Sequence, residues 1–277
     1  MNWHYQSSEV EFFLSEIARL GYKGIQISNE QATAPRFLDE LARQELVPAE
    51  QYCAIECTTA GPVEGSEAAS QETIQLAGKA GVKMIVFAVG GSDDRDSYAG
   101  RAAAAPKLTA AGYQALAKHI ATFAAKANES GIKSSFHPHA ATYVESPEET
   151  SELMHLLDSD LVGLCLDTGH WIVGGGDSAA AVVEYGSRVT HIHIKDVDAG
   201  VLRSLLNQEI KTMSTAVHDH KLFTPAGVGV LDLRGLFQAL DRIGFQGWMM
   251  SEQDSAWEAP AEASAISFRT IEYELKN

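Results

Sequence analysis

The chain has 277 residues, of which 45% are hydrophobic and 21% charged, and its formal net charge is −16. This composition supports a large buried core and excludes an extensively disordered chain. The acidic balance predicts no binding to nucleic acid or to anionic membranes, where Lys and Arg must neutralise phosphate groups. No apolar run in the sequence approaches the roughly 20 residues that cross a bilayer.

The cysteine content and the start of the chain indicate where the protein works. Cys53, Cys57 and Cys165 all lie in apolar stretches, and three cysteines are too few for a disulfide framework. We expect buried thiols in a reducing compartment. The segment Met1–Tyr5 lacks the basic start and the apolar core of a signal peptide. A cytoplasmic location is therefore expected.

Short apolar runs alternate with longer stretches of helical period, which predicts βα units around a parallel sheet. The expected strands are 24–28, 52–57, 84–89, 132–136, 161–166, 189–194 and 248–252, with a weaker eighth candidate at 2–5. The expected helices are 8–20, 35–42, 66–80, 109–130, 147–157, 178–185, 231–243 and 259–275. This α/β pattern predicts a (β/α)8 TIM barrel, with one domain over residues 1–277.

Two long irregular stretches interrupt the alternation. Residues 90–107 are rich in Gly, Asp and Ala, and Arg95 and Arg101 within them are expected to be solvated. Residues 197–229, with a helix around 201–213, follow the strand expected at 189–194 and are interpreted as a substrate lid. The triplet His218–His220 in this stretch is interpreted as a solvated loop rather than a group that reaches the substrate.

Polar residues occur at the ends of four consecutive predicted strands. They are His137 and His139, Asp167 and His170, His191, His193 and Lys195, and Glu252 and Asp254. In a βα barrel the active site lies at these carboxyl ends. A single such residue is more often a cap or a surface group. Four sets in register on neighbouring strands instead favour a site for zinc, manganese or cobalt.

These segments also carry a resemblance to a known family. Phe136–His139, Leu166–His170, His191–Asp196 and Ser251–Asp254 resemble the xylose-isomerase-like superfamily of TIM barrels. Within it, the combination of His137-Pro138-His139, Thr142, Asp167-Thr168-Gly169-His170, Phe223-Thr224-Pro225 and Gly247-Trp248 is similar to the inosose (2-keto-myo-inositol) dehydratases. The first hundred residues match only in outline.

The resemblance implies a divalent cation held by His137, Asp167, His193 and Glu252. Sugar isomerases and epimerases have a glutamate where this chain has His137. In the epimerases that glutamate forms an acid–base pair with the glutamate of the eighth strand, whose counterpart here is Glu252. The histidine favours the dehydratase branch over the epimerases. Endonuclease IV, another member, needs a basic groove, which the net charge of −16 argues against.

A dehydratase reaction on a polyhydroxylated ketone assigns roles to the remaining groups. The cation would act as a Lewis acid for the enolate, and we rank Mn²⁺ or Co²⁺ first, with Zn²⁺ or Mg²⁺ as alternatives. Lys195 and His170 are the candidates for the base and the acid, in either order, and a neighbouring cation would lower the pKa of Lys195. His139, His170 and Trp171 are candidates for substrate contact, with core packing as the alternative for Trp171.

Two other functions stay open. A sugar isomerase or epimerase would use the same cation without loss of water, and a barrel that only binds a polyol would have no turnover. The expected partners are a small polyol or keto-sugar and, as for many barrels, a further copy of the chain.

Overall fold

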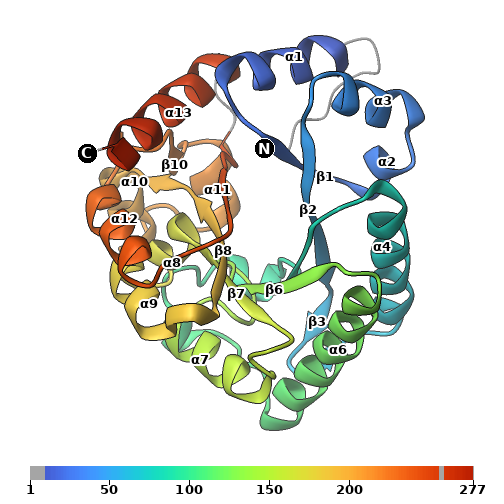
Figure 1. Cartoon of the computed structure of the whole chain (residues 1–277). Helices are drawn as coiled ribbons and strands as arrows, with labels where there is room; N and C mark the ends of the chain where they lie inside the picture. The colour runs from blue at the N-terminus through green and yellow to red at the C-terminus, as the bar shows by residue number, and fades with distance from the viewer. Residues whose placement is uncertain (1–9, 256–258, 277) are drawn as a thin grey trace.

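The computed structural model describes residues 10–255 and 259–276, in which seven strands form one sheet in the order β1-β2-β5-β6-β7-β8-β11. All neighbouring strands in it are parallel. They are β1 (Gly24–Ile27), β2 (Val47–Ile55), β5 (Met84–Val89), β6 (Lys133–His137), β7 (Gly163–Asp167), β8 (Val189–Ile194) and β11 (Trp248–Ser251). The sheet curls into a nearly closed barrel (Figure 1), which confirms the predicted fold class.

Helices between the strands cover the outside of the barrel (Figure 1). The longer ones are α1 (Val10–Leu20), α3 (Pro35–Arg43), α4 (Ser66–Ala80), α6 (Ala110–Glu129), α7 (Pro147–Leu156), α9 (Ser178–Tyr185), α12 (Leu233–Arg242) and α13 (Pro260–Lys276). Every residue of β5 is buried, as expected for a strand covered on both faces. Its outward side chains, such as Phe87, join the same apolar core as Leu116 and Ile120 of α6.

Shorter elements lie in the connections. They are the helices α2 (Asn29–Ala32), α5 (Asp93–Asp96), α8 (Thr168–Val173), α10 (Ala199–Leu206) and α11 (Met213–His218), and the 3₁₀ turns η1 (Ala102–Ala104) and η2 (Gly186–Arg188). Two antiparallel pairs join β3 (Cys57–Thr58) to β4 (Gly61–Pro62) and β9 (Asp196–Val197) to β10 (Phe223–Thr224). None of the helices in the described ranges has the length and apolar character needed to cross a membrane.

The barrel is closed by contacts between its first and last elements rather than by strand pairing among the described residues. The Tyr22 hydroxyl donates to the Ser264 carbonyl at 3.1 Å, and its ring meets Phe268 of α13 edge-on. A small cavity of about 60 Å³ lies here, lined by residues that include Ile25, Trp248 and Met250. The eighth strand candidate, Asn2–Tyr5, lies outside the described residues and stays a prediction.

The strand expected from Tyr52 begins instead at Val47. The first half of this strand could not be predicted because it contains Pro48, Glu50 and Gln51, and proline and such polar residues are uncommon inside strands. Both polar side chains find partners. Gln51 points to the helix side and donates to Asn29 at 2.6 Å, and Glu50 faces the barrel interior, where it meets two histidines.

The stretch 90–107 contains α5 and η1 and is not a plain loop. The prediction that Arg95 is solvated is wrong: its side chain is fully buried. Its guanidinium donates to both carboxylate oxygens of Glu149, at 2.9 Å each, and to the Pro106 carbonyl at 2.7 Å. Arg101 is half-buried. Among the cysteines, Cys53 and Cys165 are buried as expected, whereas Cys57 is half-buried.

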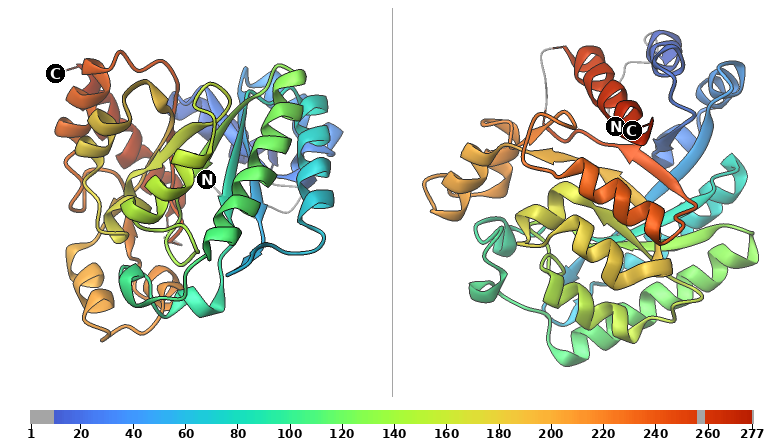
Figure 2. Two further views of the ribbon diagram at one scale, coloured as in Figure 1. Left: turned by 90° about the horizontal axis from the view of Figure 1, so that it is seen from below. Right: turned by 60° about the vertical axis from the view of Figure 1, so that its left-hand side comes forward.

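The segment expected to form a lid contains two short helices, α10 and α11, in place of one helix around 201–213. In Figure 2 these helices, in orange, lie at the same end of the barrel as the segment that contains α5. The Ser214 backbone N–H donates to Asp96 Oδ1 at 2.9 Å, which ties α11 to that segment.

Candidate metal centre

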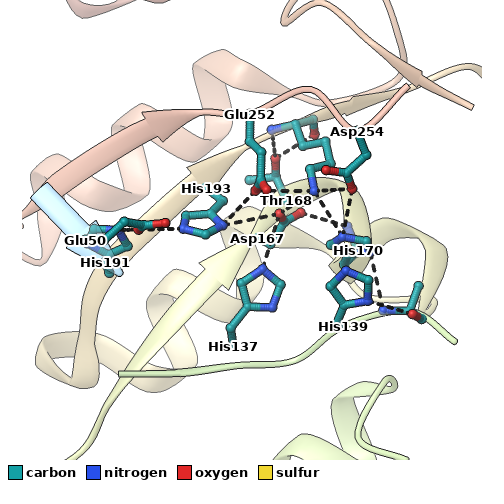
Figure 3. Close-up of polar contacts among 12 residues, drawn as sticks. Glu50, His137, His139, Asp167, Thr168, His170, His191, His193, Glu252 and Asp254 are labelled. Atoms are coloured by element: carbon teal, nitrogen blue, oxygen red, sulfur yellow. Dashed lines mark hydrogen bonds and ion pairs between the residues drawn. The ribbon is translucent and has the colours of Figure 1, made fainter. Parts of the chain in front are cut away.

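Four side chains at the carboxyl ends of neighbouring strands converge inside the barrel (Figure 3). His137 ends β6, Asp167 ends β7, His193 lies near the end of β8, and Glu252 follows β11. Each can place one ligand atom so that all four atoms lie within 4.8 Å of one another. These are the four residues predicted as metal ligands, and the structure brings all of them together.

The parallel register explains why the four groups meet. Asp167 pairs with His193 across β7 and β8, and Met250 of β11 pairs with the same His193 on its other side. Side chains alternate between the two faces of a strand, so residues of one parity point into the barrel. The convergence therefore follows from strand order and side-chain alternation.

Three of the converging atoms are buried without a hydrogen bond of regular geometry, although two of them lie near the Lys195 ammonium: Asp167 Oδ2, His193 Nδ1 and Glu252 Oε2. His193 Nδ1 lies 2.8 Å from Glu252 Oε2 and 3.7 Å from Asp167 Oδ2, and His137 Nε2 lies 3.5 Å from the same Asp167 oxygen. Buried polar atoms without partners are costly. Their common direction and the mixed imidazole–carboxylate donors fit a divalent cation such as Mn²⁺, Co²⁺ or Zn²⁺.

A second group surrounds Lys195, which is buried beside the cluster. Its Nζ lies 2.7 Å from Asp254 Oδ2, 3.0 Å from His170 Nε2, 3.1 Å from Asp167 Oδ2 and 3.3 Å from Glu252 Oε2. Thr168 fixes the lysine backbone, because its hydroxyl accepts from the Lys195 N–H at 2.9 Å and donates to the Lys195 carbonyl at 2.7 Å. Gly169 leaves room for the lysine stem, which a Cβ there would meet at 2.7 Å.

The group around Lys195 has a charge pattern of its own. Burial lowers the pKa of Lys195, but Asp167, Asp254 and Glu252 together raise it well above its usual value. These directions hold for the cluster without a cation, so the lowered pKa expected beside a bound cation stays a prediction. Burial and the Lys195 charge lower the pKa of His170, so this imidazole is neutral. His139, His170 and Asp254 form a trio close enough to hold a cation, and the Lys195 ammonium contacts two of its members, His170 and Asp254.

His139 lies beside His170, with the ring centroids 3.6 Å apart. Burial keeps the pKa of His139 well below its usual value. The His139 Nδ1 lies 2.7 Å from the Ala140 carbonyl oxygen, so Nδ1 carries the proton in this contact. Both histidines line the cavity described next.

A cavity of about 410 Å³ opens above the cluster. Its wall includes His137, His139, His170, Glu252 and Asp254 from the strand ends, Gln26 and Tyr52 from β1 and β2, and Met213, Ser214, Val217 and His218 from α11. The segment predicted as a lid thus forms part of the cavity wall. His218, which was interpreted as a solvated loop residue, is exposed at the end of α11 and also lines this cavity.

Trp171 does not line the cavity. Its side chain is buried in the main apolar core, and its indole N–H donates to the Asp177 carbonyl at 3.2 Å. Helix α8 begins at Thr168 with Asp167 as its cap and turns the residue after His170 away from the site. The position of Trp171 matches the alternative of core packing and not the expected place at the cavity wall.

Sequence reasoning missed two contributors from the first half of the chain, Glu50 and Tyr52 on β2. Tyr52 meets His137 edge-on with ring centroids 6.0 Å apart, and burial together with the Glu252 charge raises its pKa. Asp254 was noted at a strand end without a role, and it is the nearest carboxylate to Lys195. The sequence signal for Glu50 is a pair of polar residues, Glu50 and Gln51, inside the otherwise largely apolar stretch Val47–Ile55.

Fold and site together define a βα barrel with a candidate divalent-metal centre at the carboxyl ends of its strands. A family model described as xylose isomerase-like TIM barrel matches residues 14–271, and the chain belongs to this family. An inosose dehydratase of Lacticaseibacillus casei is 29% identical over 259 residues, which are 90% of this chain and 84% of that protein.

Two solved structures share the fold. The 3-keto-D-glucoside 4-epimerase YcjR from E. coli has a TM-score of 0.73 at 15% identity, over 98% of this chain and 97% of that one. The IolI protein with a bound zinc atom has a TM-score of 0.70 at 18% identity, over 98% and 94% of the two chains.

Proposed function

We propose that the protein is a metal-dependent dehydratase that removes water from a polyhydroxylated ketone such as 2-keto-myo-inositol. The observation that carries the proposal is the pairing of two groups: four converging ligands, and beside them a lysine and a neutral histidine in contact. Relatives of near-complete coverage that are named inosose dehydratase support it. A dehydratase needs a carbonyl activator, a base and an acid next to one another.

In this proposal His137, Asp167, His193 and Glu252 hold the cation. When bound, it supplies Lewis-acid polarisation of the substrate carbonyl. The two ligand carboxylates offset its charge, and two imidazoles add none, so the site suits a neutral ketone better than a sugar phosphate.

The proton transfers fall to Lys195 and His170. Elimination breaks the C–H bond next to the carbonyl and the C–O bond of the β-hydroxyl. A base accepts the proton from carbon. An acid gives a proton to the departing hydroxyl, which leaves as water. Lys195, ion-paired with Asp254 at 2.7 Å, has a proton to give and is assigned as the acid. His170 is assigned as the base. Their 3.0 Å contact lets the proton return between turnovers.

The cavity supports a polyol as substrate. Its wall offers the hydrogen-bonding side chains of Gln26, Tyr52, Asp96, His139 and His218 around the strand-end groups. A ring with several hydroxyls needs such partners on more than one side, since a buried hydroxyl without one is costly. We assign His139 to a substrate hydroxyl, because it lies against His170 at the cavity wall.

One mass-spectrometric assay tests the proposal. The protein is stripped of metal, reloaded with Mn²⁺, Co²⁺ or Zn²⁺, and incubated with 2-keto-myo-inositol. A metal-dependent product lighter by one water supports the dehydratase. A product of unchanged mass at a new retention time would replace it with an isomerase or epimerase. No product over a panel of keto-polyols, with metal bound, would favour a barrel that only binds its ligand.

A further inference from the structure

Glu50 lies beneath the candidate metal centre and is fully buried. It comes from β2, while its partners come from β8, which β5, β6 and β7 separate from it in the sheet. Its Oε2 lies 2.9 Å from His193 Nε2 and is also in contact with His191 Nε2 (Figure 3). One carboxylate oxygen thus contacts two imidazoles across the interior of the barrel.

This contact decides which nitrogen of His193 faces the cluster. A histidine that binds a metal does so as a neutral imidazole, which has one N–H and one lone pair. Because Nε2 faces the Glu50 carboxylate, which only accepts, the proton belongs on Nε2. In that form the lone pair lies on Nδ1, the atom that faces the cluster and lies 2.8 Å from Glu252 Oε2.

We infer that Glu50 is a positioning residue that fixes the orientation and the tautomer of His193, so that Nδ1 is presented to the metal. The inference rests on the proposed function, since it assumes that the four-residue cluster binds a cation. A carboxylate behind a ligating histidine also makes that histidine a better donor, and loss of such a partner commonly weakens metal binding about 10- to 100-fold.

A purely structural role for Glu50 makes a different prediction. In that case Glu50 would serve as the buried counter-charge of His191 and His193, and its loss would lower stability without changing the metal. His191 provides the matched control, because it contacts the same oxygen and is buried to the same extent but is not one of the four converging residues. Replacement of His191 removes one of the two imidazoles that contact Glu50 and leaves the contact between Glu50 and His193 in place.

The experiment compares Glu50→Gln, Glu50→Asp and His191→Gln with the unmodified protein. The dissociation constants for Zn²⁺ and Co²⁺ are measured by competition with a coloured chelator. We expect Glu50→Gln to weaken binding about 10- to 100-fold and to change the visible spectrum of the Co²⁺-loaded protein. His191→Gln should change affinity by much less. In the Zn²⁺-loaded protein, the slowly exchanging N–H signal of His193 Nε2 should shift or disappear in Glu50→Gln.

Glu50→Asp covers the case in which Glu50→Gln does not fold. It keeps the charge but draws the carboxylate back by one methylene, so it should also weaken metal binding. Unchanged affinity in whichever of the two is folded overturns the inference. Asp167→Asn separates the two proposals. Suppose that the unmodified protein binds metal, that Asp167→Asn does not, and that the folded Glu50 variants bind it with unchanged affinity. In that case only the role of Glu50 is contradicted. If the unmodified protein binds no metal, the proposed function fails as well.

Discussion

At the scale of single residues, the site depends on contacts between side chains far apart in the sequence. Lys195 contacts Asp254 and Glu252 from the segment after β11 and Asp167 from β7. Asp167 and Glu252 belong to the proposed metal ligands, whereas Asp254 belongs to the proton-transfer group. Lys195 therefore borders both groups, and its replacement distinguishes a catalytic role from a structural one.

Replacement of Lys195 by Ala should lower turnover on the keto-polyol about 100-fold or more, the usual loss when a general acid is removed. Bound metal should stay near one equivalent, because none of the four ligands changes. Elemental analysis and single-turnover assays check both values. Loss of the metal together with activity would show that the ammonium holds the ligand carboxylates in place and would argue against its role as the acid.

Glu252 offers the complementary test. Replacement of Glu252 by Gln keeps the size of the side chain but removes one of the two anionic ligands, so both bound metal and turnover should fall. Metal content after dialysis and the dehydration rate are the measurements. If both survive at the level of the unmodified protein, Glu252 is no ligand and the assignment of the centre is wrong.

At the scale of elements, the segment after β5 is held by the buried ion pair of Arg95 and Glu149. Arg95 lies at α5, and Glu149 is part of the capping box of α7, where its side chain accepts from the Ser146 N–H. The pair thereby anchors the connection that also carries Asp96, the acceptor for α11. From the sequence alone Arg95 is expected to be solvated, because a lone arginine in a polar stretch is usually exposed.

Replacement of Arg95 by Met should cost about 3–5 kcal/mol of unfolding free energy, since it leaves the Glu149 carboxylate buried without its cation. The double replacement Arg95→Met with Glu149→Gln should recover a large part of this loss. Denaturant unfolding of both single variants and the double variant forms the cycle that measures the coupling. Strictly additive effects would mean that the two side chains act independently.

The contact of α4 with α6 gives a prediction about pH. His119 Nε2 lies 2.9 Å from the Ser70 hydroxyl, and burial lowers the pKa of His119. The folded state therefore prefers the neutral ring. Its contribution is complete above the unfolded pKa of about 6.5 and declines as the pH falls below that value.

Relative to His119→Gln, which does not titrate, the unmodified protein should be more stable at pH 7.5 than at pH 5.5. Unfolding by urea at both pH values provides the comparison. A stability difference between the two proteins that does not change with pH would contradict the prediction.

At the scale of the whole molecule, the alternation of apolar runs and helical periods was enough to predict the parallel barrel, because each βα unit carries its own local pattern. The polar strand-end side chains could be predicted for the same reason, since their positions follow from where the strands end, whereas the choice of four ligands among them came from the resemblance to the family. Glu50 and Arg95 could not, because their partners lie in distant segments and only packing brings them together. The position of Trp171 could not be predicted either, because the local turn of α8 directs its side chain away from the site.

The metal should also stabilise the whole barrel, because its ligands come from β6, β7, β8 and the residue after β11 and so join strands across the sheet. A ligand that binds only the folded state at 100 times its dissociation constant adds about 2.7 kcal/mol. For a protein of this size that corresponds to a rise of about 5 °C in melting temperature. Removal of the metal with a chelator should reverse the rise, and re-addition of Zn²⁺ or Mn²⁺ should restore it. Asp167→Asn is the control and should melt at one temperature with and without metal. An equal rise in that variant would place the bound ion elsewhere on this acidic chain, outside the four-residue cluster.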